Sequence, residues 1–102
     1  MAYEPRPIET DEIKIPDHLK EVVEILAANQ HDIWAMKKME SGYIYGEKNS
    51  EPIYKDGKVV TPGKSSYLVP YDELPEDIKD YDRANVLGTI RGLLKLGYSI
   101  SK

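Results

Sequence analysis

The sequence predicts a mainly α-helical fold with minor β structure, in which two principal antiparallel helices and a short helix bracket an irregular loop with a small β-hairpin. Three observations lead to this fold class. Apolar side chains recur at helical spacing near both ends of the chain, and an Asp-Gly pair lies between two short β-prone segments in the middle. The 102 residues suit one domain, and we divide them into an extended N-terminal arm (1–16) and a folded domain (17–102).

The first helix is expected over residues 17–40. Pro16 and Asp17 suit a helix start, because proline fits a first turn and an acidic side chain is favoured at the positive end of the helix dipole. Gly42 is the expected stop. Between this start and this stop, the apolar residues lie mostly on one helical face, namely Leu19, Val22, Val23, Leu26, Ala27, Ile33 and Trp34.

The middle of the chain is expected to be non-helical. Tyr43–Gly46 has the composition of a short extended segment, and Ile53–Val60 that of a hairpin that turns at Asp-Gly. Thr61–Ser66 is expected to be a loop. Tyr67–Tyr71 follows as a short apolar segment, and Pro70 limits it to an edge position in any sheet.

Two further helices are expected towards the C-terminus. Leu74-Pro75-Glu76-Asp77 has the pattern of a helix start, and we expect a short helix that ends near Tyr81. Asp82 is expected to cap a second helix, and an ion pair within Tyr81-Asp82-Arg83 to hold the intervening turn. Gly97 should end this helix, whose buried stripe comprises Val86, Leu87, Ile90, Leu93 and Leu94.

Composition narrows the function class. The net charge of −4 argues against coating a nucleic-acid polymer, which needs a clustered basic face, but leaves room for a small anionic ligand. The sequence contains no run of eighteen apolar residues, so we expect no membrane helix. The absence of cysteine excludes disulfides and thiolate metal sites. We therefore expect a cytoplasmic protein. Eight tyrosines, one tryptophan and no phenylalanine suit either a shallow core or an aromatic-walled pocket.

Motifs for enzymatic chemistry are weak. Gly63-Lys64-Ser65 resembles the end of a P-loop, but Lys58 stands where the first glycine is required. His31 and Asp32 are adjacent on a helix and point in different directions, so we expect His31 to bond a backbone group or a tyrosine instead of acting as a base. No histidine and carboxylate spacing fits a metal site. We expect no catalytic residues, no cofactor and no metal, and hence no enzyme.

Four segments occur together in an order that resembles the ryanodine-receptor repeat, the RyR domain. They are the lead-in Tyr3–Pro7, LAANQHDIWAMKKMESGYIYG at 26–46, YLVPYDELPEDIKDYDR at 67–83 and TIRGLLKLGYSI at 89–100. The resembling repeats occur in tandem in ryanodine receptors and as lone or fused domains in bacterial and phage proteins. The chain is most similar to the latter, stand-alone type.

The resemblance implies a recognition module. Bacterial members are thought to sense nucleotide-like signals, and a receptor repeat pair holds an adenine nucleotide through the tryptophan of H-x-x-W and a basic residue four positions later. Those positions are Trp34 and Lys38 here. Two positions depart from the family's pattern: Tyr67 stands where a further basic contact is expected, and Tyr43 replaces a tryptophan.

The residues allow two interpretations of this region. Trp34 and Lys38 share a helical face, where the indole could stack on a base and the ammonium could pair with a phosphate. Alternatively, Trp34 is explained by packing in the core, and Lys38 is explained by its position at a solvated helix end. Our leading hypothesis is a sensor of a nucleotide-like or other anionic small ligand. The alternative is a protein-interaction or self-association module that uses tyrosines such as Tyr54, Tyr67 and Tyr71, with a partner protein or a fused effector. The candidate ligand residues are Trp34, Lys38, Tyr43, Tyr45 and Lys64.

Overall fold

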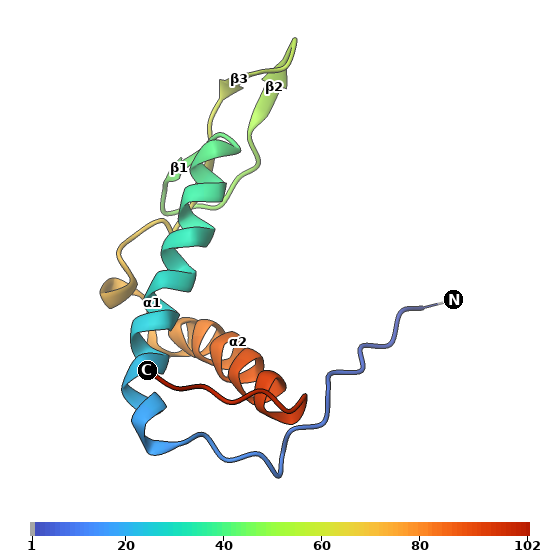
Figure 1. Cartoon of the computed structure of the whole chain (residues 1–102). Helices are drawn as coiled ribbons and strands as arrows, with labels where there is room; N and C mark the ends of the chain where they lie inside the picture. The colour runs from blue at the N-terminus through green and yellow to red at the C-terminus, as the bar shows by residue number, and fades with distance from the viewer. Residues whose placement is uncertain (1) are drawn as a thin grey trace.

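The computed structural model describes residues 2–102 and confirms the mainly α fold class with minor β structure (Figure 1). Two long helices dominate, and short strands and one 3₁₀ turn lie between them in the chain. Among the described residues, no helix combines the length and the apolar character that crossing a membrane requires. The elements are α1 (Asp17–Glu40), β1 (Tyr43–Tyr45), β2 (Ile53–Lys55), β3 (Lys58–Thr61), β4 (Gly63–Ser65), the 3₁₀ turn η1 (Tyr71–Glu73) and α2 (Glu76–Lys95).

The first helix has the predicted bounds. α1 begins directly after Pro16 and ends at Glu40, and the Ser41 amide donates to the carbonyls of Lys37 and Lys38 in its last turn. Gly42 follows with a φ of 95°, a left-handed conformation that glycine adopts without steric cost. The left-handed conformation of Gly42 therefore prevents the chain from continuing as a right-handed helix.

The expectation of two separate helices after Leu74 is wrong. α2 runs without interruption from Glu76 to Lys95, so Asp82 lies inside the helix and caps nothing. No glycine or proline occurs between positions 76 and 87, and nothing local therefore breaks the helix. Arg83 pairs not with Asp82 but with carboxylates one and two turns earlier in α2, which favours the continuous helix. The short helical turn instead precedes α2, as η1 after Pro70.

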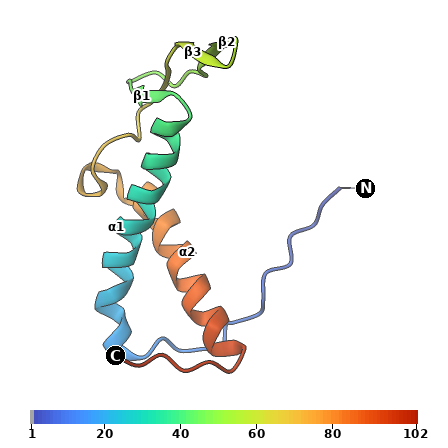
Figure 2. The same ribbon diagram turned by 45° about the horizontal axis from the view of Figure 1, so that its top comes forward.

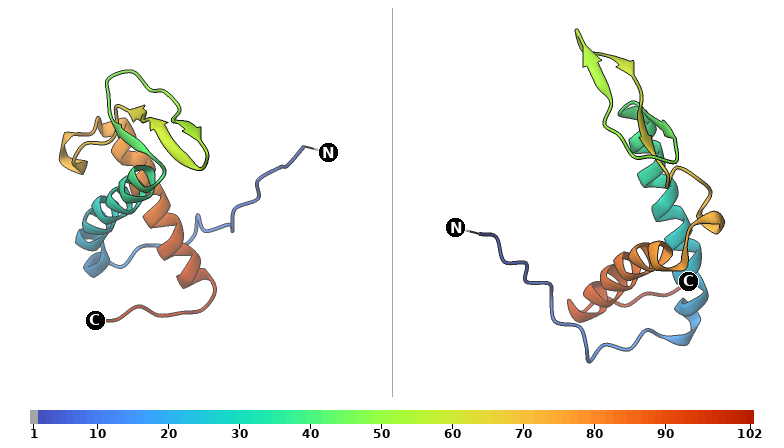
Figure 3. Two further views of the ribbon diagram at one scale, coloured as in Figure 1. Left: turned by 90° about the horizontal axis from the view of Figure 1, so that it is seen from above. Right: turned by 180° about the vertical axis from the view of Figure 1, so that it is seen from behind.

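The two helices run in opposite directions and diverge from a crossing at the middle of α1 (Figure 2). The core lies at this crossing and is small. The C-terminal segment returns towards the start of α1 (Figure 3). Ile100 of this segment and Ile15 of the arm add partly buried side chains to the core. Its buried members are Leu19 and Ala27 of α1, Tyr71 and Leu74 around η1, and Val86 and Ile90 of α2.

The hairpin is confirmed. β2 and β3 pair antiparallel, with an irregularity between Ile53 and Tyr54, and they extend past the end of α1 (Figure 1). The turn residues Asp56 and Gly57 have φ angles of 53° and 76°, the positive values that a two-residue hairpin turn needs. The Asp-Gly signal thus located the turn at the correct residues.

The loop expected over Thr61–Ser66 contains a strand. β4 pairs parallel with β1, with Tyr43 opposite Gly63 and Tyr45 opposite Ser65. The pairing depends on a close approach, because a Cβ atom on Gly63 would lie 2.8 Å from the Tyr43 ring. Such contacts between distant segments leave no alternation of apolar and polar residues in the sequence, so the sequence does not predict this strand. Tyr67–Tyr71 forms no strand.

Candidate ligand-binding site

Trp34 lies in the second half of α1, half-buried, with its indole stacked on the ring of His31. The two ring centroids are 5.4 Å apart and the planes differ by 24°. His31 is buried, and its Nε2 lies 2.7 Å from the carbonyl oxygen of Val69. A carbonyl only accepts, so Nε2 carries the proton and donates it. The expected backbone partner of His31 is confirmed, and this anchored ring holds one face of Trp34.

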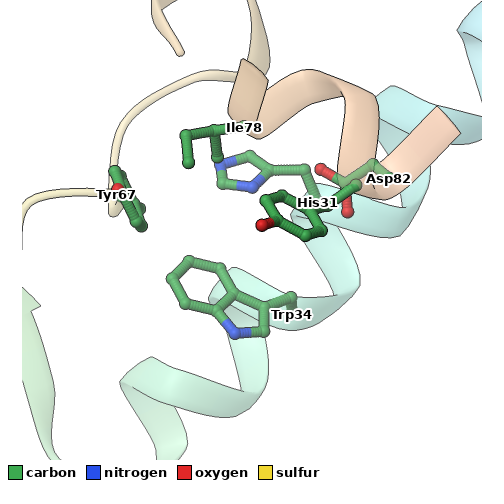
Figure 4. A pocket seen from close by; sticks show the side chains of 6 residues that line it. His31, Trp34, Tyr67, Ile78 and Asp82 are labelled. Atoms are coloured by element: carbon green, nitrogen blue, oxygen red, sulfur yellow. The ribbon is translucent and has the colours of Figure 1, made fainter. Parts of the chain in front are cut away.

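An apolar cavity of about 290 Å³ opens beside this ring pair, between α1 and the start of α2 (Figure 4). The side chains of Trp34, Tyr67 and Ile78 surround its centre, and Asp82 lies at its edge (Figure 4). Burial raises the pKa of the Asp82 carboxyl above its ordinary value. The residues that line the cavity are His31, Trp34, Tyr67, Ile78, Tyr81 and Asp82.

A second, polar cavity of about 410 Å³ adjoins the first, and Trp34 and Tyr67 border both. It lies between the last turns of α1 and the β1–β4 pair. Four of the five candidate residues meet here, namely Trp34, Lys38, Tyr43 and Lys64. The remaining lining residues are Asn49, Ser50, Glu51, Ser65 and Tyr67.

Lys38 is held between two aromatic rings. Its Nζ lies 4.3 Å from the ring centroid of Tyr43 and 5.9 Å from that of Trp34. Both distances allow a cation–π interaction, which is worth about 0.5–1 kcal/mol at an exposed site. The ammonium therefore lies beside the aromatic wall of the polar cavity, where these contacts favour it over a freely solvated position.

Tyr43 contributes a ring wall and a fixed hydroxyl. Its Oη donates to Glu51 Oε2 at 2.6 Å, and this bond to the carboxylate raises the pKa of Tyr43. Glu51 is the one carboxylate in the lining, against the two ammonium groups of Lys38 and Lys64. The formal charge of the lining is therefore +1, from two positive groups and one negative group.

Lys64 is positioned by its backbone and by a glycine. It lies in the middle of β4, and it exchanges two backbone hydrogen bonds with Ser50, at 2.9 and 3.0 Å. Its stem lies across Gly46, where a Cβ atom would come within 2.6 Å of the Lys64 Cδ atom. Gly46 leaves room for this stem, and the Ser50 bridge fixes the backbone of Lys64, which lines the polar cavity.

The structure does not bring Tyr45 to the site. Its side chain is exposed and lines neither cavity. Conversely, the polar cavity is also lined by Asn49, Ser50 and Glu51, which the sequence does not predict because they follow Gly46 in an irregular segment and carry no motif. Their only sequence signal is polar composition close to the predicted ligand residues, and this signal is too common to select them.

The RyR domain family model matches residues 3–102, which include most of the arm, the hairpin and both helices. The chain belongs to the RyR domain family. The resemblance carried by the four sequence segments is thereby confirmed. In this RyR domain, Trp34 and Lys38 lie on one cavity wall, and Tyr67 lies where that wall continues into the apolar cavity. Membership alone assigns no ligand, because related folds serve different functions through their sites.

Proposed function

We propose that this RyR domain is a non-enzymatic recognition module that binds a small ligand with a planar ring and an anionic group, such as a nucleotide. One observation carries the proposal: Trp34 and Tyr67 separate an apolar cavity from a polar cavity that bears two ammonium groups. A ligand that has both chemical parts fits this pair of cavities, since binding sites combine apolar walls with a few placed polar groups.

The ring of the ligand would occupy the apolar cavity beside Trp34. Stacking of a base on an aromatic side chain is worth about 1–3 kcal/mol. Asp82 supplies a hydrogen-bond acceptor at the edge of that cavity, suited to an amino group on the ring. The cavity is small, about 290 Å³, which suits one ring system and leaves the rest of the ligand to the neighbouring space.

The anionic group would lie in the polar cavity near Lys38 and Lys64. The Glu51 carboxylate opposes an anion there, and its hydrogen bond from Tyr43 holds it in place. Two cations against one carboxylate favour a single phosphate group over a longer phosphate chain. Tyr67 offers no charge, so we expect affinity for a nucleoside monophosphate or a cyclic nucleotide rather than for a triphosphate.

The single tryptophan makes the test direct. Trp34 fluorescence is titrated with adenosine, AMP, cyclic AMP, ADP-ribose and ATP on the wild-type chain and on the variants K38Q and K64Q. Binding of AMP or cyclic AMP with about ten-fold weaker affinity in either variant supports the proposal, since ten-fold corresponds to one lost charged contact. The matched control is K55Q, which removes the same charge from the exposed hairpin strand β2. Absence of any fluorescence or melting response across the panel contradicts the proposal.

Protein interaction is the second candidate function, and the shape of the molecule favours it. The radius of gyration is 17.3 Å, whereas a compact domain of this length has roughly 13 Å. The hairpin presents exposed apolar side chains, Ile53, Tyr54 and Val60. Tyr71, named as a possible contact from sequence, is buried in the core and is unsuited to this role. A mass in light scattering that rises with concentration, and falls in the variant Y54S, would support this candidate.

A further inference from the structure

A cleft on the opposite end of the domain from Trp34 has no role in the proposed function. It lies where the arm segment 13–15 runs beside the first turns of α1 and the second half of α2, and its volume is about 690 Å³. None of its lining residues belongs to the two cavities around Trp34. Its walls are partly apolar, through Val23 and Leu87, and partly charged.

Arg91 of α2 is the central feature of this cleft. Its Nε atom is buried and has no hydrogen-bond partner among residues 2–102. The other α2 arginine, Arg83, provides the contrast, because it donates hydrogen bonds to three carboxylates. No ion pair found within the described chain includes Arg91. A guanidinium N–H without an acceptor is unfavourable, and the Arg91 side chain as a whole is only half-buried and lines the cleft, so the guanidinium can take an acceptor there.

The surrounding charges favour an anion as that acceptor. Lys14 from the arm and Lys20 from α1 line the same cleft as Arg91. Asp17 is the one acidic residue in the lining, and its carboxylate lies 2.9 Å from the Lys20 Nζ atom. The lining therefore has a formal charge of +2, from three cations and one carboxylate, on a chain whose net charge is −4.

We propose that this cleft is an oxyanion site, in which Arg91 binds a carboxylate or phosphate group and Lys14 and Lys20 add charge. The planar guanidinium matches two oxygens of either group, and each such hydrogen bond is stronger than one between neutral groups. Lys14 belongs to the arm, whereas Arg91 belongs to α2. Anion binding would consequently hold the arm against the helices, and it does so independently of any ligand at Trp34.

The test uses the full chain and amide chemical shifts. Inorganic phosphate and acetate are titrated separately, and their relative affinities distinguish a phosphate site from a carboxylate site. We expect a saturable shift of the amides of Lys14, Ile15 and Arg91 with at least one of the two anions. In R91Q we expect the affinity to fall about ten-fold or more, as for a lost charge-assisted hydrogen bond, and in K14Q to fall less. In K55Q, which removes the same charge elsewhere, the affinity should match the wild type.

Two results would overturn the proposal. One is the absence of saturable shifts at these amides with both anions. The other is an affinity in R91Q equal to that in K55Q. Should R91Q not fold, K14Q and K20Q decide, and unchanged affinity in both overturns the site. The variant K38Q should leave these shifts unchanged, which separates this site from the Trp34 cavities.

Discussion

The Arg83 guanidinium in α2 donates two hydrogen bonds to the Glu24 carboxylate in α1, from Nε to Oε2 at 2.8 Å and from Nη2 to Oε1 at 2.9 Å. Tyr71 also donates to Oε1 of Glu24, at 2.7 Å. One carboxylate thus joins α1, η1 and α2 at the border of the core. Hydrogen bonds from Arg83 first, and from Tyr71 second, lower the pKa of Glu24 from 4.5 to about 2. Burial, followed by the bond to Glu24, raises the pKa of Tyr71 to about 12.

Glu24 should make the stability of the fold acid-sensitive. Because its pKa is lower in the folded chain than in the unfolded chain, its contribution is complete above pH 4.5 and is lost as pH falls towards about 2. We expect E24Q to lower the free energy of unfolding at pH 7 by about 1 kcal/mol, since the half-exposed carboxylate is screened by water. Urea unfolding between pH 2 and pH 7 measures both effects.

The matched control for Glu24 is E21Q, because Glu21 is an exposed acid on the same helix. The pKa of Glu76 is also lowered, first by its own hydrogen bond from Arg83. The pH dependence of E24Q should therefore be reduced and not abolished. Equal pH profiles for wild type and E24Q would contradict the role of Glu24.

The hydrogen bond from His31 to Val69 should contribute more to the stability of the fold than the shape of the imidazole does. H31L leaves the Val69 carbonyl without this donor, and we expect a loss of about 1–3 kcal/mol in the free energy of unfolding. H31Q retains an N–H donor at a similar reach and should lose less. Chemical denaturation of both variants tests this order. An equal loss in the two would mean that packing against Trp34, and not the hydrogen bond, explains the burial of His31.

Two glycines of the C-terminal half should respond to alanine with opposite signs. A Cβ atom meets nothing within 4 Å at either Gly88 or Gly97, so space does not distinguish them. Gly88 lies inside α2, and G88A should stabilise the fold by about 0.5–1 kcal/mol through helix propensity. Gly97 has a φ of 98°, and G97A should destabilise it by about 1 kcal/mol. Melting temperatures of the pair decide, and a shift of the same sign in both would refute the conformational explanation.

Gly63 should be needed for the polar cavity as well as for stability. An added Cβ atom would lie 2.7 Å from Pro52 Cδ, 2.8 Å from the Pro52 backbone nitrogen and 2.8 Å from the Tyr43 ring, so both neighbours or the β4 backbone must shift. We expect G63A to cost about 1–3 kcal/mol, as for overpacking, and to weaken ligand binding at the Lys38 and Tyr43 wall. Thermal melting and the Trp34 titration measure the two effects. S66A, in the same segment, is the control, and a G63A variant as stable as S66A would show that β1 and β4 pair without this close approach.

Local signals in the sequence were sufficient for part of the fold. The bounds of α1 follow from its helical apolar spacing, Pro16 and Gly42, all of which act within a few residues of the helix. The hairpin turn follows from Asp56 and Gly57, because these residue types tolerate the positive φ angles of the turn without distant contacts. The family also follows from the sequence, because four segments in a fixed order form a specific combination. Each of these properties depends on local residue patterns or on the order of segments along the chain, both of which are visible in the sequence.

Only the tertiary structure decided which residues share a space. The parallel pairing of β1 with β4 brings Lys64 to Lys38 and Tyr43, whereas Tyr45, two residues from Tyr43, is exposed and does not line the cavity. The continuity of α2 places Asp82 beside the apolar cavity instead of at a helix cap. The arm and α2 are likewise far apart in the sequence but line one cleft in the fold. There the Arg91 Nε atom is buried without a hydrogen-bond partner among residues 2–102. The physical reason is common to all three: long-range packing brings together residues whose separation in the chain carries no periodic pattern.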